Sequence, residues 1–475
     1  MPDHPLIGLS LDPNAPTAMF AQIYDALRQR IVCGEIGAGR RLPPSRSFAE
    51  ELGVSRTTVV TAYDQLIAEG FAEGRTGSGV YVSDIGTVEI APAPQPRSVA
   101  ETPALAQPSA LRPFHPGHPD MRLFPHRQWG QCLARVARTD PQALAIQTDP
   151  FGDLLLRTAI ADYLAEWRAM KVSPEQILIT AGASDALEIC VRTLAQPGDS
   201  VALENPGYRV LRALIQSLGL QTIWLDVDEH GAQLPTATPV PLMSVLTPSS
   251  QYPLGGAMPL ARRRDFLAWS EHHGGWIVED DYDSEFRYGG RPIPALSSFD
   301  NHGRTLYIGS FSKVFSDTLR LGFLVMPRHL IPNIGATLAR FGSKASLIGQ
   351  RPLGVFMQDG GFYRHIRRMR RIYAERRRVL IGLFRDHFID ERVQWRDHHS
   401  GMHLVVHLPS DCDDVEIAAR ATDAGLSCPA LSTYCAGAHP RRGLLLGFCG
   451  FDAPALQDAM PKLARIVMDA LNRIP

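Results

Sequence analysis

Lysine is almost absent from this chain. Only four of the 48 Lys and Arg residues are lysines, at positions 171, 313, 344 and 462. An amine can lose its proton at accessible pH and attack an aldehyde to form an imine, whereas a guanidinium cannot. A lysine kept in such a chain is therefore a candidate for amine chemistry, and Lys313, in the segment SFSK at 310–313, is the first candidate.

The chain also lacks paired cysteines, a targeting or membrane segment and a large net charge. The seven cysteines are scattered without a CxxC pair, which is typical of reduced thiols rather than of a disulfide framework. The N-terminus lacks a basic segment followed by an apolar one, and no run reaches the roughly 18 apolar residues that span a bilayer. The formal net charge is -1, so any nucleic-acid site must be a local surface. We expect a soluble, cytoplasmic protein with no membrane segment.

The length and composition of the chain predict several domains. Because a single core rarely grows beyond roughly 250 to 300 residues, a chain of 475 residues is expected to form at least two domains. Residues 91–113 are dominated by Ala, Pro, Gln and Ser, which cannot bury enough apolar surface to order themselves. We expect an N-terminal domain over 1–83, a linker over 84–112 and a C-terminal domain over 113–475.

The N-terminal domain has the pattern of three short helices and a hairpin. Apolar residues at helical spacing between Phe20 and Ile31 predict the first helix, and two more are predicted over Ser45–Leu52 and Arg56–Glu69. β-forming residues around a Gly-rich turn in 71–82 predict a two-stranded wing.

The segment LGVSRTTV at 52–59 has the order of a helix-turn-helix: a helix end, a glycine turn, a capping serine and a polar first turn. Side chains of that first turn reach base edges in the major groove, while flanking cations hold phosphates. The predicted DNA contacts are Arg56, Thr57 and Thr58, with Arg46 in the preceding helix and Arg75 and Gly79 in the wing. Residues 1–83 carry seven arginines and nine acidic residues, so charge gives no support, and a protein-interaction module stays an alternative.

Residues 42–82, LPPSRSFAEELGVSRTTVVTAYDQLIAEGFAEGRTGSGVYV, resemble the winged helix of GntR-type bacterial regulators. The resemblance extends over nearly all of residues 17–83. It implies binding to a double-stranded DNA operator, and it places Arg46, Arg56, Thr57, Thr58 and Gly79 at the family's DNA-contact positions.

The C-terminal domain alternates short apolar runs with longer amphipathic stretches. This alternation predicts an α/β fold with a largely parallel sheet covered on both faces. The predicted strands are 177–180, 200–204, 243–246, 276–279, 305–308 and 321–325.

Polar groups follow several of these strands, where a parallel sheet places its ligands. Ala183 and Ser184 open a helix after the strand 177–180, so their backbone N–H groups can hold a phosphate, and Ser310 and Arg320 can add a hydroxyl and a guanidinium. Asp280 can keep a pyridine nitrogen protonated, and Tyr282 can hydrogen-bond a ring hydroxyl. Tyr208 offers a face for stacking. With the imine-forming Lys313, this set predicts pyridoxal 5'-phosphate as the cofactor.

Residues 113–475 resemble a fold-type I aminotransferase, and with the winged helix the whole chain is similar to the MocR subfamily of GntR regulators. The resemblance rests on FHPGHPD, TAGASDALE, LTPSSQYP, VEDDYDSEFRY and GSFSKVFSDTLRLGFL. It implies a PLP-dependent transferase fold, with a small subdomain mainly in 355–475, and head-to-tail homodimers. It also implies roles: Lys313 as the Schiff-base lysine, Asp280 as the pyridinium partner, Tyr282 as the ring-hydroxyl partner, and Ser184, Ser310 and Arg320 as phosphate ligands.

Two departures from the aminotransferase pattern concern substrate binding. Where the family has an NPTG motif, this chain has QYPLG at 251–255, which puts Tyr252 in place of the usual asparagine. Where the family binds the substrate carboxylate with an arginine before the last strand's Leu-Gly-Phe, this chain has Leu445. Arg441 and Arg442 are the candidate replacements for that arginine, although the spacing supports neither strongly. We predict that Arg442 contacts the effector.

Other interpretations of single motifs are less favoured. The acidic run 279–285 could hold Mg or Ca, SxxK at 310–313 matches a β-lactamase motif without its partner motifs, and His403 with His407 could bind a metal. We expect no metal site. The arginine run in 363–371 is predicted to be a solvated helix rather than a second DNA surface.

The favoured hypothesis is a transcriptional regulator that binds pyridoxal 5'-phosphate through Lys313 and senses an amine effector or the cofactor itself. An active aminotransferase with an attached DNA-binding domain is the alternative, and the absent carboxylate arginine argues against it. A DNA-binding dimer with an inert pocket is the third hypothesis.

Overall fold

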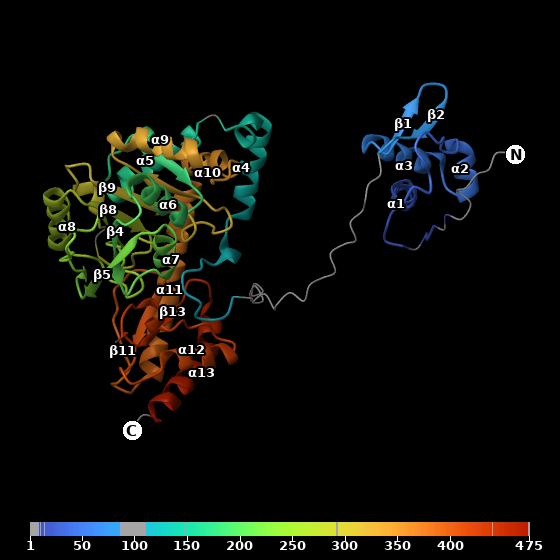
Figure 1. Ribbon diagram of the computed structural model, residues 1–475. Helices are drawn as coiled ribbons and strands as arrows, with labels where there is room; N and C mark the ends of the chain where they lie inside the picture. Colours follow the sequence, from blue (N-terminus) through green and yellow to red (C-terminus); the bar gives the residue numbers. More distant parts are fainter. Residues whose placement is uncertain are drawn as a thin grey trace. The chain divides into compact units, whose positions relative to one another are not determined.

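The computed structural model describes residues 9, 11–13, 15–85, 111–147, 149–290, 293–438 and 440–473. The chain divides into two compact units, Met1–Gln107 and Pro108–Pro475 (Figure 1). The predicted linker, 84–112, lies almost entirely outside the described residues. Within those residues, no helix is long and apolar enough to cross a membrane.

The first unit contains the three helices and the hairpin that the sequence predicts. The helices are α1 (Met19–Val32), α2 (Ser45–Leu52) and α3 (Arg56–Ala68), and the antiparallel strands are β1 (Ala72–Arg75) and β2 (Gly79–Val82). Ile23, Leu27, Phe48, Val59 and Leu66 are fully buried between these elements. The apolar spacing seen in the sequence is therefore the core of a small winged helix.

The turn between α2 and α3 follows the local signals of the sequence. Gly53 ends α2 in the left-handed conformation, with φ +67°, which glycine adopts without steric cost. Ser55 caps α3 by accepting a hydrogen bond from the backbone N–H of Thr58 at 3.1 Å. These two residues fix where the second helix of the helix-turn-helix begins.

The second unit is built on an eight-stranded mixed sheet with the order β3-β10-β9-β8-β7-β4-β5-β6. Its strands are β3 (Ile177–Thr180), β4 (Ser200–Asn205), β5 (Gln221–Asp228), β6 (Gly231–Ala232), β7 (Met243–Leu246), β8 (Trp276–Asp281), β9 (Thr305–Ser310) and β10 (Gly322–Val325). All six predicted strands are present. β10 runs antiparallel to both neighbours, and β5 and β6 were not predicted.

Helices cover both faces of this sheet and continue into a smaller subdomain. They are α4 (His126–Thr139), α5 (Leu154–Arg168), α6 (Ala183–Leu194), α7 (Arg209–Ser217), α8 (Leu260–His273), α9 (Ile331–Phe341), α10 (Gln350–Gln358), α11 (Gly361–His387), α12 (Asp414–Asp423) and α13 (Ala453–Leu471). The three-stranded antiparallel sheet β11 (Gln394–Trp395), β12 (His403–His407) and β13 (Gly443–Gly447) gathers with α12 and α13 at one end of the unit (Figure 1).

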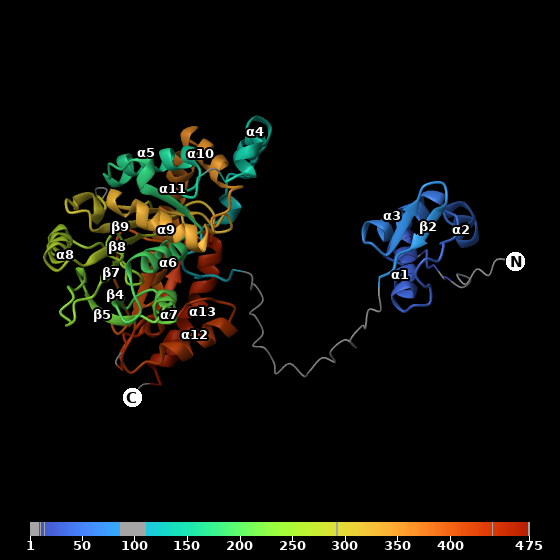
Figure 2. The ribbon, with the colours of Figure 1, turned by 45° about the horizontal axis from the view of Figure 1, so that its top comes forward.

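Different helices pack on the two faces of the large sheet. Val278 of β8 and Ile308 of β9 pack in one apolar cluster with α6, α7 and α9. The alternate residues, Ile277 and Tyr307, face the side covered by α5, α8 and α10, where α5 and α10 lie together (Figure 2). Because successive strand residues point to opposite faces, polar residues at the strand ends are also divided between the two sides.

Candidate functional site

Lys313 lies in the turn that follows β9, and its amine is held inside the second unit. Nζ donates a hydrogen bond to the carbonyl oxygen of Gly117 at 2.7 Å. Burial lowers the pKa of the Lys313 amine, and the carboxylates of Asp317, Asp283 and Asp280 partly oppose that shift. A lowered pKa increases the fraction of unprotonated amine at neutral pH, which is the form that attacks an aldehyde.

Gly117 brings the FHPGHPD segment against this amine. Its backbone has φ +73°, and a Cβ added there would lie 3.1 Å from Lys313 Nζ. The backbone conformation therefore favours glycine, and the end of the lysine side chain would have to shift slightly to accommodate a Cβ. His115 and His118, in the same segment, lie edge to face at 4.5 Å, and burial lowers the pKa of both rings, so both are neutral near pH 7.

Asp280, near the end of β8, is half-buried, and one of its carboxylate oxygens is buried without a partner. Its Oδ1 atom makes no hydrogen bond with any residue that the structure describes. Burial, together with the charges of Asp281 and Glu204, raises the pKa of Asp280 to about 7, while Lys313 lowers it. An orphaned buried acceptor is costly, and a protonated ring nitrogen is the kind of donor that would satisfy it.

The predicted phosphate ligands meet at the ends of three adjacent strands. Gly322 of β10 pairs with Ser310 of β9 on one side and with Thr180 of β3 on the other. A Cβ at Gly322 would lie 2.9 Å from the Cα of Gly182, which has φ +115° and precedes α6. This close packing places the N-terminal turn of α6, with Ala183 and Ser184, beside Ser310.

Arg320 lies two residues before Gly322 and is exposed. Its backbone adopts the left-handed conformation, with φ 51°, which is uncommon for a residue with a side chain. No ion pair forms between Arg320 and any described carboxylate. The N-terminal turn of α6, the Ser310 hydroxyl and an unpaired guanidinium form a set that suits a phosphate group.

Aromatic side chains line the same site on the other side of Asp280. The Tyr282 hydroxyl donates to Ser250 Oγ at 3.3 Å. Tyr252, in place of the aminotransferase asparagine, lies edge to face with Tyr208 at 6.0 Å and with Tyr282 at 5.6 Å between ring centroids. Tyr208 is 44% exposed, and it lines a pocket together with Asp280.

The residues present fit pyridoxal 5'-phosphate. A lysine amine with a lowered pKa, an unpartnered carboxylate and an anion cradle at a helix N-terminus lie along connected strand ends. When bound, the cofactor would supply an aldehyde for Lys313 and a ring nitrogen for Asp280. These groups could be identified from the sequence because each follows a strand. Gly117 was not predicted to belong to the site, because its sequence shows no more than a glycine between two histidines.

The end of the site where aminotransferases bind a carboxylate is apolar. Leu445 of β13 is fully buried and packs with Val405 and Leu431, while Leu254 and Tyr434 cover this cluster. The predicted effector contact, Arg442, instead donates to the buried carboxylate of Asp414 at 3.0 Å. An effector that contacts Arg442 would have to share its guanidinium with Asp414 or displace this carboxylate.

Several of the histidines and acids that were alternative metal ligands have partners within the protein. No group of three or more His, Cys, Asp or Glu side chains is placed to hold a metal within the described ranges. His403 is buried and hydrogen-bonds the Pro253 carbonyl at 2.8 Å. In the acidic run, Glu279 accepts from the backbone of Leu296 and Asp281 pairs with Arg168 at 2.8 Å.

The predicted DNA-contact residues lie at exposed positions of the first unit. Arg56 and Thr57 are exposed at the start of α3, and Thr58 is half-buried. Arg46 is exposed on α2, near Glu50 at 3.9 Å. In the wing, the Arg75 guanidinium lies 4.5 Å above the ring of Tyr81. These side chains lie at the beginning of α3, the second helix of the helix-turn-helix, and on the wing.

Gly79 begins the second wing strand with φ +115°. A Cβ there would lie 2.9 Å from the Nε atom of Arg41. The glycine therefore allows Arg41 to pack along the wing, next to its β-bridge with Tyr81. Arg41 is thus a further cation beside the predicted DNA contacts of the wing.

Comparisons with known proteins cover both units. Residues 20–82 match the family described as bacterial regulatory proteins, gntR family, and residues 121–438 match aminotransferase class I and II. The chain is 36% identical to the probable rhizopine catabolism regulatory protein MocR of Rhizobium meliloti, over 98% of each chain. It is 34% identical to the pyridoxine biosynthesis regulator PdxR of Corynebacterium glutamicum, over 97% of this chain and 98% of that protein.

Among solved structures, the second unit is similar to LysN, the α-aminoadipate aminotransferase of Thermus thermophilus. The TM-score is 0.69 at 25% identity, over 77% of this chain and 94% of that chain. That protein was crystallised with N-(5'-phosphopyridoxyl)-L-leucine. The second unit therefore has the fold-type I aminotransferase fold, and the first has the GntR winged-helix fold.

Proposed function

We propose a sensing function for this chain, which belongs to the MocR subfamily of GntR-type transcriptional regulators. Its aminotransferase-like unit binds pyridoxal 5'-phosphate at Lys313 and uses this site as a sensor. The chain is a helix-turn-helix transcriptional regulator with an aminotransferase-like domain. The signal is either a small amine that competes with Lys313 for the cofactor aldehyde or the cofactor itself.

The observation that carries the cofactor assignment is the buried, unpartnered Oδ1 atom of Asp280 in the same site as Lys313. A buried acid held near a pKa of about 7 is costly for a protein that never fills the site. A cationic ring nitrogen would restore its ionised form. A relative named for control of pyridoxine biosynthesis supports the cofactor as one signal, and a relative named for rhizopine catabolism supports another small molecule.

The apolar cluster around Leu445 favours sensing over turnover. Full transamination requires a keto acid to enter, bind its carboxylate and be reprotonated. Leu445, Val405 and Leu431 offer no charged group for that carboxylate, and Arg442 is paired with Asp414. A bound amine can exchange with Lys313 without this carboxylate contact, so reversible capture needs fewer groups than turnover.

A ligand can regulate DNA binding only if it binds one arrangement of the protein more tightly than another. We propose that occupation of the Lys313 site changes how the aminotransferase-like units pair as a head-to-tail homodimer in the cytoplasm. Two winged helices held by such a dimer would engage two operator half-sites. Arg56, Thr57 and Thr58 would then read bases, with Arg46, Arg75 and Gly79 placing the backbone contacts.

The test is a footprint of the full-length protein on the DNA upstream of its own gene, with and without pyridoxal 5'-phosphate. We expect protection of two half-sites, with an affinity that changes on cofactor addition in the wild type and in Lys462→Ala. Lys462 is a matched control because it is exposed and, among the described residues, pairs only with Asp458 on its own helix. Lys313→Ala should keep specific protection but lose the response to the cofactor.

Two outcomes would contradict this function. A cofactor response that persists in Lys313→Ala would remove the lysine from the sensing step. Sustained amino transfer to added keto acids, over many turnovers per site, would favour the aminotransferase alternative and leave DNA binding as an accessory property.

A further inference from the structure

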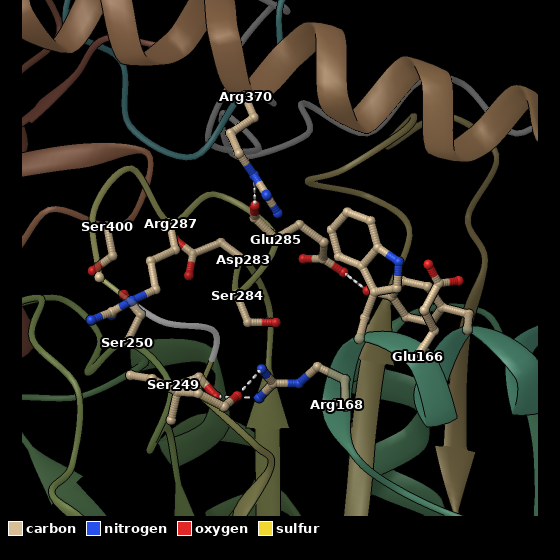
Figure 3. Close-up of a pocket in the computed structure, with 14 residues that line it drawn as sticks. Glu166, Arg168, Ser249, Ser250, Asp283, Ser284, Glu285, Arg287, Arg370 and Ser400 are labelled. Atoms are coloured by element: carbon tan, nitrogen blue, oxygen red, sulfur yellow. Dashed lines mark hydrogen bonds between the residues drawn. The ribbon is translucent and has the colours of Figure 1, made fainter.

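A second cavity lies beside the Lys313 site, on the opposite side of β8. It has a volume of about 350 Å³, a size that suits a small ligand. Figure 3 shows polar side chains converging on it from α5, from the loop after β8 and from α11. Arg168, Arg287, Arg370, Ser250, Asp283 and Ser400 are the lining residues that bear on its chemistry.

The geometry of β8 separates this cavity from the cofactor site. Asp280 has the same parity as Val278, which faces α6 and α7. Asp281 has the parity of Ile277, which faces α8, and its carboxylate pairs with Arg168 at the end of α5. Successive strand residues point to opposite faces, so the Arg168 side of the strand does not face the predicted cofactor ring.

Two arginines of the cavity have no carboxylate partner among the residues that the structure describes. Arg287 makes no ion pair, its Nε is buried without a hydrogen bond, and burial alone lowers its pKa. Arg370 donates from Nε to the backbone oxygen of Glu285 at 2.8 Å, and its guanidinium lies 5.0 Å above the ring of Trp167. Both cations therefore have donors left for a ligand. Arg168, by contrast, is neutralised by Asp281, although its Nε also lacks a partner.

Three acids line the cavity, Glu166, Asp283 and Glu285, and no ion pair joins any of them to Arg287 or Arg370 in the described part of the chain. Asp283 is 1% exposed, and neither carboxylate oxygen has a hydrogen-bond partner of normal geometry in the described part of the chain. Burial raises the pKa of Asp283 well above its usual value, which favours the protonated form of this group, a hydrogen-bond donor. Burial also raises the pKa of Glu285 to about 7, and Glu285 accepts a hydrogen bond from Tyr163.

We propose that this cavity is a second binding site, which takes a small organic carboxylate between Arg287 and Arg370. The guanidinium fork matches a planar carboxylate better than any other common side chain does. The hydroxyls of Ser250 and Ser400 and the Asp283 carboxyl are the further polar contacts that line the site. A half-buried arginine without a counter-ion is costly, and a bound anion removes that cost.

The position of the cavity gives the ligand a route to the cofactor site. Ser250 lines the cavity, and its Oγ accepts a hydrogen bond from Tyr282, the predicted partner of the cofactor ring hydroxyl. The same cavity is bounded by α5 of the large sheet domain, by α11 and by Ser400 next to β12. An anion bound here would therefore tie the small subdomain to the large one and adjust the wall of the sensing site.

The binding test is calorimetric titration of succinate into two full-length proteins. One is the wild type with cofactor, and the other is the Lys313→Ala variant. We expect saturable binding in both proteins, because the cavity does not include Lys313. Arg287→Gln should weaken it roughly tenfold or more, since a charge-assisted pair is lost. Arg371→Gln is the matched control, because Arg371 is an exposed neighbour on α11 and lies outside the cavity; its affinity should stay within twofold of the wild type.

Arg370→Gln provides a second variant from another element, in case Arg287→Gln fails to fold, and circular dichroism with thermal melting checks both. Unchanged succinate affinity in a folded Arg287→Gln or Arg370→Gln protein would overturn the site. Binding that disappears in Lys313→Ala but survives in these variants would place succinate at the cofactor site instead. Saturable binding of inorganic phosphate in place of succinate would overturn the carboxylate assignment.

Discussion

The amine of Lys313 lies 2.7 Å from the carbonyl oxygen of Gly117, which comes from a segment almost two hundred residues earlier in the chain. This contact joins the FHPGHPD segment to the turn after β9. It also holds the amine in place without a carboxylate in direct contact, so the charged form gains little and burial can lower the pKa of the lysine.

Gly117→Ala should therefore impair cofactor capture. The added Cβ would approach Nζ to 3.1 Å, and the φ of +73° is unfavourable for alanine. We expect slower and weaker binding of pyridoxal 5'-phosphate, measured by the visible absorbance of the lysine-bound cofactor. Gly130→Ala is the control, because Gly130 lies in α4 with open space around it. That substitution should leave capture unchanged, and equal capture by both variants would contradict the role of Gly117.

Asp280→Asn should have opposite effects on stability and on cofactor binding. The folded protein holds the Asp280 pKa at about 7, above the value near 4 of an unfolded aspartate. Its contribution to stability is therefore present below about pH 4 and is lost as the pH rises toward 7. At pH 8 the cofactor-free Asp280→Asn protein should be more stable, on the order of 1 to 3 kcal/mol, in thermal or denaturant unfolding.

The same variant should bind the cofactor more weakly, because an amide cannot hold the ring nitrogen in its protonated form. In the wild type, pairing requires the ionised carboxylate, so the affinity should fall below about pH 7 by up to tenfold per pH unit. The Asp280→Asn protein would lack this dependence. Asp226→Asn, at an exposed position of β5, is the control that should change neither property. A wild-type affinity that is flat from pH 5 to pH 8 would rule out Asp280 as the ring partner.

Most of the fold was predictable because local signals and burial agree. The strand Met243–Leu246 is buried along its whole length, and three of its four residues are apolar, so a short apolar run marks it in the sequence. β5, Gln221–Asp228, was not predicted because polar residues stand at both of its ends and only two of its residues are buried. The antiparallel direction of β10 could not be predicted, because it depends on the path of the chain and not on the composition of the strand.

The candidate site was predictable only where its groups follow a strand directly. Asp280 and Lys313 could be placed because parallel strands bring their carboxyl ends to one edge. The orphaned state of the Asp280 carboxylate depends on side chains from several elements and has no local signal. The ion pair of Arg442 with Asp414 likewise joins β13 and α12, so spacing along the chain could not reveal that the arginine is already occupied.

Gly322→Ala should weaken the phosphate cradle. A Cβ at this position would lie 2.9 Å from both the Cα of Gly182 and the backbone oxygen of Gly309, and neither backbone atom can move without shifting the start of α6. We expect loss of retention of pyridoxal 5'-phosphate on dialysis, together with a lower melting temperature. Gly382→Ala, on α11 with nothing near its added Cβ, is the control for an alanine substitution at a glycine. Full cofactor retention in a Gly322→Ala protein would show that α6 does not form the phosphate site.

Arg56→Ala should reduce sequence-specific DNA binding. The Arg56 side chain is exposed at the start of α3. Its one hydrogen bond to the described residues is a long one of 3.4 Å to Ser45 Oγ, so it can turn toward a base edge without breaking the fold. Loss of one base contact costs about 1 to 3 kcal/mol, or roughly tenfold to a hundredfold in operator affinity. Fluorescence anisotropy with the footprinted operator and with a scrambled duplex measures this loss. Thr61→Ala is the control, because Thr61 is exposed one turn further along α3 and bonds only the Thr57 carbonyl; it should stay within about twofold. Undiminished preference of Arg56→Ala for the operator over the scrambled duplex would place the base contacts elsewhere on the winged helix.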